Sequence, residues 1–199
     1  MVAKNDWRRM GQEEYLMDAK LQYVDRYTPC SETWEHEHCA FCNRKISTYE
    51  GDLHSGYCTT DNKQSHWLCP ACFDDFKEEF QWNVTKIPFE IFGKIMERDV
   101  VKKPSCIEVC FSVDGYPEYG SCWLGKMPDR ETGLAVYWYG LVEDGSQAYD
   151  FASFDDFASA PVFQGKSLKD IWCFITLWLL DGCSPGEMLA YYLKGKKLF

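Results

Sequence analysis

The chain has 199 residues, long enough for one large domain or two small ones, and its 46% hydrophobic and 17% aromatic content is typical of a globular protein. Its net charge of −10 argues against the extended basic surface of nucleic-acid-binding proteins. The N-terminal segment has no apolar signal region, and the longest apolar run, Ile171–Leu180, is too short to span a bilayer. We therefore expect a cytoplasmic protein without a membrane partner.

The first half of the sequence predicts three helices and two short strands. Apolar residues recur at helical spacing from Gln12 to Tyr27, which predicts an amphipathic helix. Short strands are expected at Ile46–Tyr49 and Gly56–Thr59. Phenylalanines at helical spacing predict a helix that begins near Cys72, and a further helix is expected at Phe89–Arg98.

A polar stretch, Arg98–Ser105, is expected to separate two domains, residues 1–100 and residues 101–199. Beyond it the apolar period changes from about 3.6 to 2, which indicates strands. Turn-forming pairs such as Asp144-Gly145 separate these strands, as in an antiparallel sheet. The expected strands are Cys106–Val113, Gly120–Lys126, Leu134–Val142 and Gln147–Phe154.

Two helices are predicted after the sheet. Ser167 with Asp170 is a helix start, and we expect that helix to continue to about Asp181. Ser184-Pro185 begins the second, which ends near Leu193. The predicted fold class is α+β, with a zinc-binding first half and an antiparallel sheet packed by helices in the second half.

Four cysteines in the first half have the spacing of a metal site. Cys39 and Cys42 form one CxxC pair, and Cys69 and Cys72 form another after an interval of 26 residues. Two such pairs present four soft sulfur ligands to one tetrahedral zinc ion. We expect one structural zinc per chain, because residues 38–81 are too few to build a core of their own.

The arrangement resembles the treble-clef group of zinc fingers over about residues 38–81. In that group a CxxC turn, a short hairpin and a CxxC that opens a helix follow one another, as they are expected to do here. The resemblance implies Cys39, Cys42, Cys69 and Cys72 as ligands, and it implies a scaffold without an activity.

A second ligand set has comparable spacing. The first CxxC pair is followed after 23 residues by His66-x2-Cys69, which is similar to the first zinc site of LIM domains. In that arrangement His66 replaces Cys72 as the fourth ligand. The second cysteine cluster of a LIM domain is missing from this chain.

Other residues in the same region could supply further ligands. A second zinc or an open catalytic site would require three residues of one group to converge. The alternative interpretation places the histidines in solvated or loop positions and the cysteine in a strand. The group consists of His36, His38, His54 and Cys58.

The charge of this region favours a protein partner. Residues 31–80 contain ten acidic and four basic residues, an excess of six negative charges, which would repel a phosphate backbone and attract a basic protein. We expect a zinc-stabilised binding or adaptor protein that acts through protein–protein contacts, such as an acidic neutraliser of the immunity type. The alternative is a metal-dependent, hydrolase-like enzyme with a site between the two halves that uses His54, Cys58 or His66.

Overall fold

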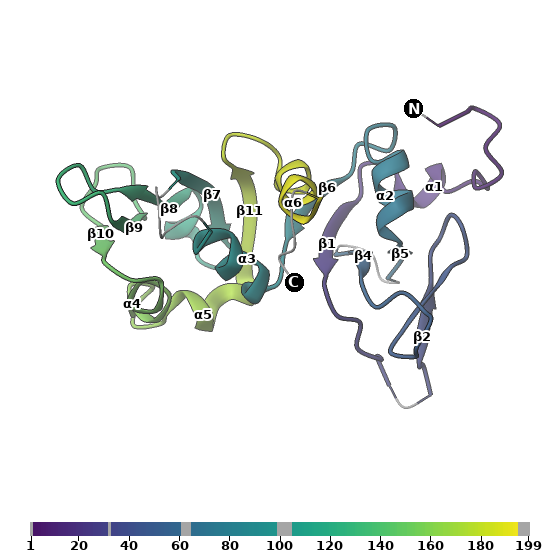
Figure 1. Ribbon diagram of the computed structural model, residues 1–199, viewed down its shortest axis with the longest axis horizontal. Helices are drawn as coiled ribbons and strands as arrows, with labels where there is room; N and C mark the ends of the chain where they lie inside the picture. Colours follow the sequence, from purple (N-terminus) through teal and green to yellow (C-terminus); the bar gives the residue numbers. More distant parts are fainter. Residues whose placement is uncertain (1, 32, 61–64, 99–104, 195–199) are drawn as a thin grey trace. The chain divides into compact units, whose positions relative to one another are not determined.

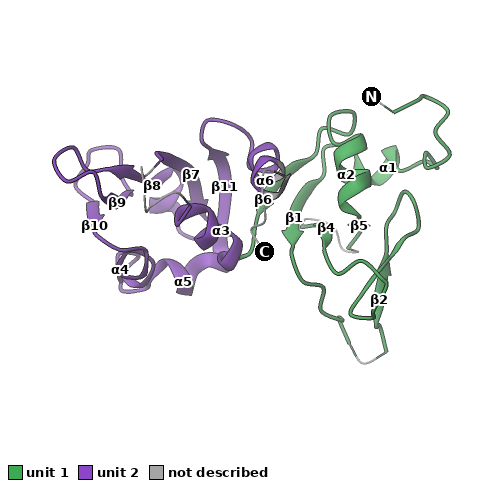
Figure 2. Cartoon of the chain, viewed as in Figure 1, with its two compact units in different colours: residues 1–88 green, residues 89–199 purple. Residues whose placement is uncertain are grey.

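The computed structural model describes residues 2–31, 33–60, 65–98 and 105–194. The chain divides into two compact units, residues 1–88 and residues 89–199 (Figure 2). Each unit combines helices with open sheets, which confirms the predicted α+β class (Figure 1). Residues 99–104 of the expected domain boundary lie outside the described part. Within that part, no helix has the length and apolar character needed to cross a membrane.

Unit 1 contains a four-stranded sheet with the order β5-β4-β1-β6 and a separate hairpin of β2 and β3. Strand β1 pairs antiparallel with β4 and parallel with β6. The elements of unit 1 are α1 (Glu13–Leu16), β1 (Lys20–Val24), β2 (His36–His38), β3 (Lys45–Ser47), β4 (Gly56–Thr59), β5 (Trp67–Leu68), α2 (Pro70–Phe76) and β6 (Asn83–Lys86).

The long helix predicted for Gln12–Tyr27 is wrong. Only α1 is helical, and Asp18 beyond it has a positive φ of 56°, a conformation that does not continue a helix. The chain then forms β1, in which Leu21 and Tyr23 alternate into the core. Apolar residues in this segment satisfy both the helical and the strand period, and pairing with β4 and β6 favours the strand. The strands expected near Ile46 and at Gly56–Thr59 match β3 and β4.

The core of unit 1 is largely aromatic. Phe41, between the first two cysteines, stacks on Phe76 of α2 with ring centroids 4.5 Å apart. Tyr57 of β4 stacks on Phe73 of the same helix at 3.8 Å. The indole N–H of Trp82 donates a hydrogen bond to the carbonyl oxygen of Leu16. These contacts fix α2, which carries one cysteine pair, against the turn that carries the other.

Unit 2 contains a five-stranded antiparallel sheet with the order β10-β9-β8-β7-β11. The four predicted strands match β7 to β10, and the predicted helices at Phe89–Arg98 and Ser184–Leu193 match α3 and α6. The elements are α3 (Phe89–Met96), β7 (Ile107–Val113), η1 (Pro117–Tyr119), β8 (Cys122–Pro128), β9 (Ala135–Gly140), β10 (Ala148–Phe151), α4 (Phe154–Ser159), α5 (Leu168–Ile171), η2 (Trp172–Phe174), β11 (Ile175–Leu180) and α6 (Pro185–Lys194).

The helix predicted from Ser167 to Asp181 is wrong beyond its first turns. Ser167 and Asp170 form the expected capping box of α5, but the helical conformation ends with η2. Residues Ile175–Leu180 form β11, which pairs with β7 at the edge of the sheet. A helix of this sequence would be apolar on nearly all sides, whereas the strand buries Ile175 and Leu177 and leaves Trp178 partly exposed.

Candidate metal centre

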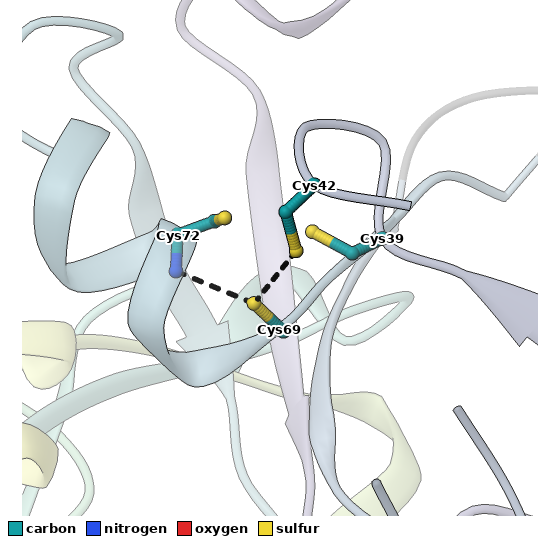
Figure 3. Close-up of side chains that lie close together, drawn as sticks. All are labelled: Cys39, Cys42, Cys69 and Cys72. Atoms are coloured by element: carbon teal, nitrogen blue, oxygen red, sulfur yellow. Dashed lines mark hydrogen bonds between the residues drawn. The ribbon is translucent and has the colours of Figure 1, made fainter. Parts of the chain in front are cut away.

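The four predicted cysteines lie together in unit 1. Their Sγ atoms all lie within 4.8 Å of one another, and those of Cys42 and Cys69 are 3.6 Å apart. The side chains converge on a common point from the turn after β2 and from the start of α2 (Figure 3). Three of these cysteines are buried and Cys42 is partly buried.

The first pair is positioned by a tight turn. The backbone N–H of Asn43 donates to the carbonyl of Cys39 at 2.9 Å, and Asn43 has the positive φ of 57° that such a turn requires. The N–H of Cys39 donates to the carbonyl of Arg44, which closes the turn between β2 and β3. The sulfurs of Cys39 and Cys42 therefore project from one rigid loop.

The second pair is positioned by the N-terminus of α2. Cys69 is the N-cap residue, Pro70 occupies the first turn, and the backbone N–H of Cys72 donates to Cys69 Sγ at 3.4 Å (Figure 3). This is the role that serine or aspartate plays in other helix caps, and it stabilises negative charge on the sulfur. Local sequence thus explains how the two sulfurs of each pair are presented.

The geometry fits a tetrahedral metal ion. Four thiolates at a Zn–S distance of about 2.3 Å would place their sulfurs about 3.8 Å apart, close to the observed 3.6 Å between Cys42 and Cys69. In the described residues, no other group of three or more His, Cys, Asp or Glu side chains has the geometry to hold a metal ion. His66 is not a member of the group, so the geometry favours Cys72 as the fourth ligand.

Without a cation, the cluster favours a single thiolate. The thiols of Cys69 and Cys72 donate toward Cys39, which lowers the pKa of Cys39. The hydrogen bond to the Cys39 sulfur raises the pKa of Cys69 to about 12, and the hydrogen bonds to Cys39 and Cys69, together with burial, also raise the pKa of Cys72. Because several thiolates this close repel one another, a central divalent cation is what would hold all four in the ionised form.

The remaining candidate ligands lie elsewhere. His54 Nδ1 lies 2.7 Å from the carbonyl oxygen of Ser47, and the Gln22 amide donates to Cys58 Sγ at 2.9 Å. Burial raises the pKa of the Cys58 thiol, which makes it a poor nucleophile. The other three histidines line a cavity of about 590 Å³ in unit 1: His36, His38 and His66.

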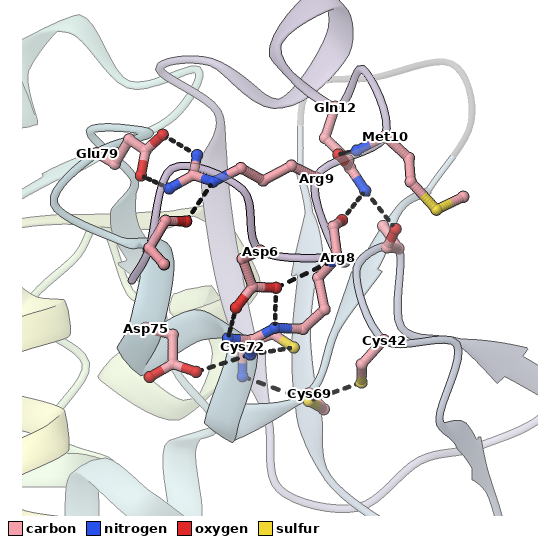
Figure 4. A network of polar contacts seen from close by, with 12 residues as sticks. Asp6, Arg8, Arg9, Met10, Gln12, Cys42, Cys69, Cys72, Asp75 and Glu79 are labelled. Atoms are coloured by element: carbon pink, nitrogen blue, oxygen red, sulfur yellow. Dashed lines mark hydrogen bonds and ion pairs between the residues drawn. The ribbon is translucent and has the colours of Figure 1, made fainter. Parts of the chain in front are cut away.

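Arg8 is a residue of the site that sequence reasoning missed. Its guanidinium donates to Cys72 Sγ at 3.5 Å and to Asp75 at 2.7 Å, and Asp6 orients it through further hydrogen bonds (Figure 4). These bonds, those with Asp6 above all, raise the pKa of Arg8, which is therefore a permanent cation beside the sulfurs. No spacing in the sequence connects residue 8 with a cysteine 64 positions later.

Gln12 connects the N-terminal segment to the first cysteine turn. Its side-chain amide is buried and donates to the carbonyl oxygens of Arg8 and Ala40 at 2.8 and 3.0 Å. The segment that carries Arg8 is thereby held against both cysteine pairs (Figure 4).

Comparison of the chain with family models, with curated proteins and with solved structures found no match.

Proposed function

We propose that unit 1 is a binding module folded around one structural zinc ion held by Cys39, Cys42, Cys69 and Cys72. The observation that carries the proposal is the convergence of four sulfurs within 4.8 Å. Four thiolates fill a tetrahedral coordination sphere and leave no position for water or substrate, which favours a structural over a hydrolytic role. The turn, the hairpin and the helix capped by Cys69 support assignment to the treble-clef type.

We further propose that the protein acts through contacts with a protein partner in the cytoplasm. The acid excess of residues 31–80 supports a basic partner, and neutralisation of such a partner by an acidic protein of the immunity type is consistent with that charge. The six cysteines of unit 1 form no disulfide, which suits a reducing compartment.

The substitution Cys39→Ser tests the structural role of the metal. Losing one thiolate should release zinc and expose the amides of β4 and α2 to hydrogen exchange, because the metal would link the turn after β2 to the start of α2. Cys30→Ser is the matched control, since Cys30 is an exposed, free cysteine of the same unit. A Cys39→Ser protein with wild-type zinc content and wild-type exchange in unit 1 would contradict the proposal.

The same two variants test the contact role. Crosslinking in the source cells, followed by mass spectrometry, should identify one protein bound to both the wild type and Cys30→Ser, and Cys39→Ser should lose it. If all three chains give the same crosslinks, the zinc module does not mediate the contact.

A further inference from the structure

The cavity in unit 1 is built from the two segments that carry the cysteine pairs. Ala40 lies between Cys39 and Cys42, and its backbone N–H donates to the carbonyl of Trp67 at 2.8 Å. Residues Ser65–Trp67 form another part of the wall and lead directly to Cys69. The volume of about 590 Å³ lies within the range of roughly 300–1,000 Å³ found for ligand sites.

Two carboxylates in the wall are held in place by hydrogen bonds. The indole N–H of Trp34 donates to Glu37 Oε1 at 2.9 Å, and the hydroxyl of Tyr49 donates to Glu35 Oε2 at 2.7 Å. The bond to the Glu35 carboxylate raises the pKa of Tyr49. The second oxygen of each carboxylate has no hydrogen-bond or ion-pair partner among the residues that the structure describes.

Two exposed aromatic side chains in the wall complement a cation. Trp34 and Tyr15 are 57% and 40% exposed, and aromatic faces of this kind attract guanidinium and ammonium groups. His66 packs against Tyr15 with ring centroids 4.6 Å apart, which supports the orientation of that ring. In the described part of the wall, no lysine or arginine competes for the carboxylates.

We propose that this cavity binds a basic peptide segment of the partner protein, with one arginine or lysine side chain between Glu35, Glu37 and Trp34. The inference rests on the proposed function, because it names the surface and the chemistry of that protein contact. The cavity is larger than a single side chain requires, which favours a segment of several residues over an isolated cation. Two carboxylates beside an aromatic face can bind a guanidinium by paired hydrogen bonds and by stacking.

The probe for this proposal is the peptide acetyl-(Gly-Arg)3-amide, with the same peptide carrying neutral citrulline as the ligand control. Calorimetry of the zinc-loaded full chain at physiological salt should show binding of the arginine peptide and at least about tenfold weaker binding of the citrulline peptide. Free arginine amide should bind at least about tenfold more weakly than the peptide.

The double substitution Glu35→Gln with Glu37→Gln should weaken peptide binding about tenfold, because it removes charge while the amide oxygens still accept from Tyr49 and Trp34. Glu50→Gln with Glu78→Gln removes two exposed charges of the same unit and should leave affinity nearly unchanged. Trp34→Leu should weaken binding severalfold, whereas Trp7→Leu, at a Trp that is 69% exposed, should not.

The assignment of the cavity would be overturned if the Glu35/Glu37 and Glu50/Glu78 double variants lost equal peptide affinity. It would also be overturned if the arginine and citrulline peptides bound with equal affinity. Free arginine amide that binds as tightly as the peptide would overturn the peptide as occupant. The zinc content of every sample separates the two proposals. If the zinc-loaded chain does not bind the arginine peptide, only the proposal that the cavity binds a peptide is contradicted. If the chain is purified without zinc, the proposed zinc centre is contradicted, whether or not the peptide binds.

Discussion

Arg8 places a positive charge next to the cysteine cluster. Four thiolates around a doubly charged cation carry two net negative charges, and the guanidinium 3.5 Å from Cys72 Sγ offsets part of this excess. Asp6 and Asp75 hold the guanidinium in place. Arg9, its neighbour, pairs with Glu79 instead.

Substitution of Arg8 by methionine should therefore destabilise the metal–thiolate centre without removing a ligand. We expect zinc transfer to a colorimetric chelator to accelerate on the order of fivefold, together with faster alkylation of Cys72. Arg9→Met provides the control, because Arg9 also packs over Phe76 and forms an ion pair with Glu79, which follows α2 in the chain. Equal zinc transfer rates for the two variants would show that proximity to sulfur is unimportant.

At the scale of elements, the sequence predicts features that depend on neighbouring residues, but it does not predict strands that form by pairing with distant segments. The CxxC pairs, the capping box of Ser167 and the start of α6 depend on a few neighbouring residues, and each was predicted from them. Segments β1 and β11 contain apolar residues that also fit a helical pattern. Their strand conformation comes from partners distant in sequence, such as Thr59 for Leu21 and Phe111 for Leu177. The contact between Arg8 and Cys72 likewise joins residues that are distant in sequence, so no local pattern predicts it.

The sheet of unit 2 contains a glycine that tolerates no side chain. A Cβ atom at Gly125 in β8 would lie 2.2 Å from the carbonyl oxygen of Ile107 and 2.8 Å from the ring of Trp138. Gly125→Ala should therefore lower the free energy of unfolding of unit 2 by at least about 2 kcal/mol.

Gly140→Ala is the matched control for this substitution. A Cβ atom at Gly140 would meet its nearest neighbour, the Trp138 ring, at 3.8 Å, so we expect a change within about 0.5 kcal/mol. Hydrogen exchange of the β8 amides across a urea series measures both values. Equal stability of the two variants would mean that the tight packing of β7 on β8 is relaxed in solution.

At the scale of the whole molecule, the two units differ in what stabilises them. Unit 1 combines short strands with the cysteine cluster, and an N-terminal segment packs against both cysteine pairs. Unit 2 has a five-stranded sheet with buried aliphatic and aromatic residues, and none of the four clustered cysteines belongs to it. The dependence on metal is therefore expected to be confined to residues 1–88.

The most direct test of the account is the metal content of the chain, purified without a histidine tag and without added metal. Mass spectrometry of the wild type, His66→Ala and Cys72→Ser should give about one zinc per chain for the first two and a loss of zinc for the third. Absence of a bound metal, or retention by Cys72→Ser with loss by His66→Ala, would contradict the four-cysteine centre, and iron in place of zinc would contradict zinc as its metal. About two zinc ions per chain would contradict a single site and implicate His36, His38, His54 or Cys58.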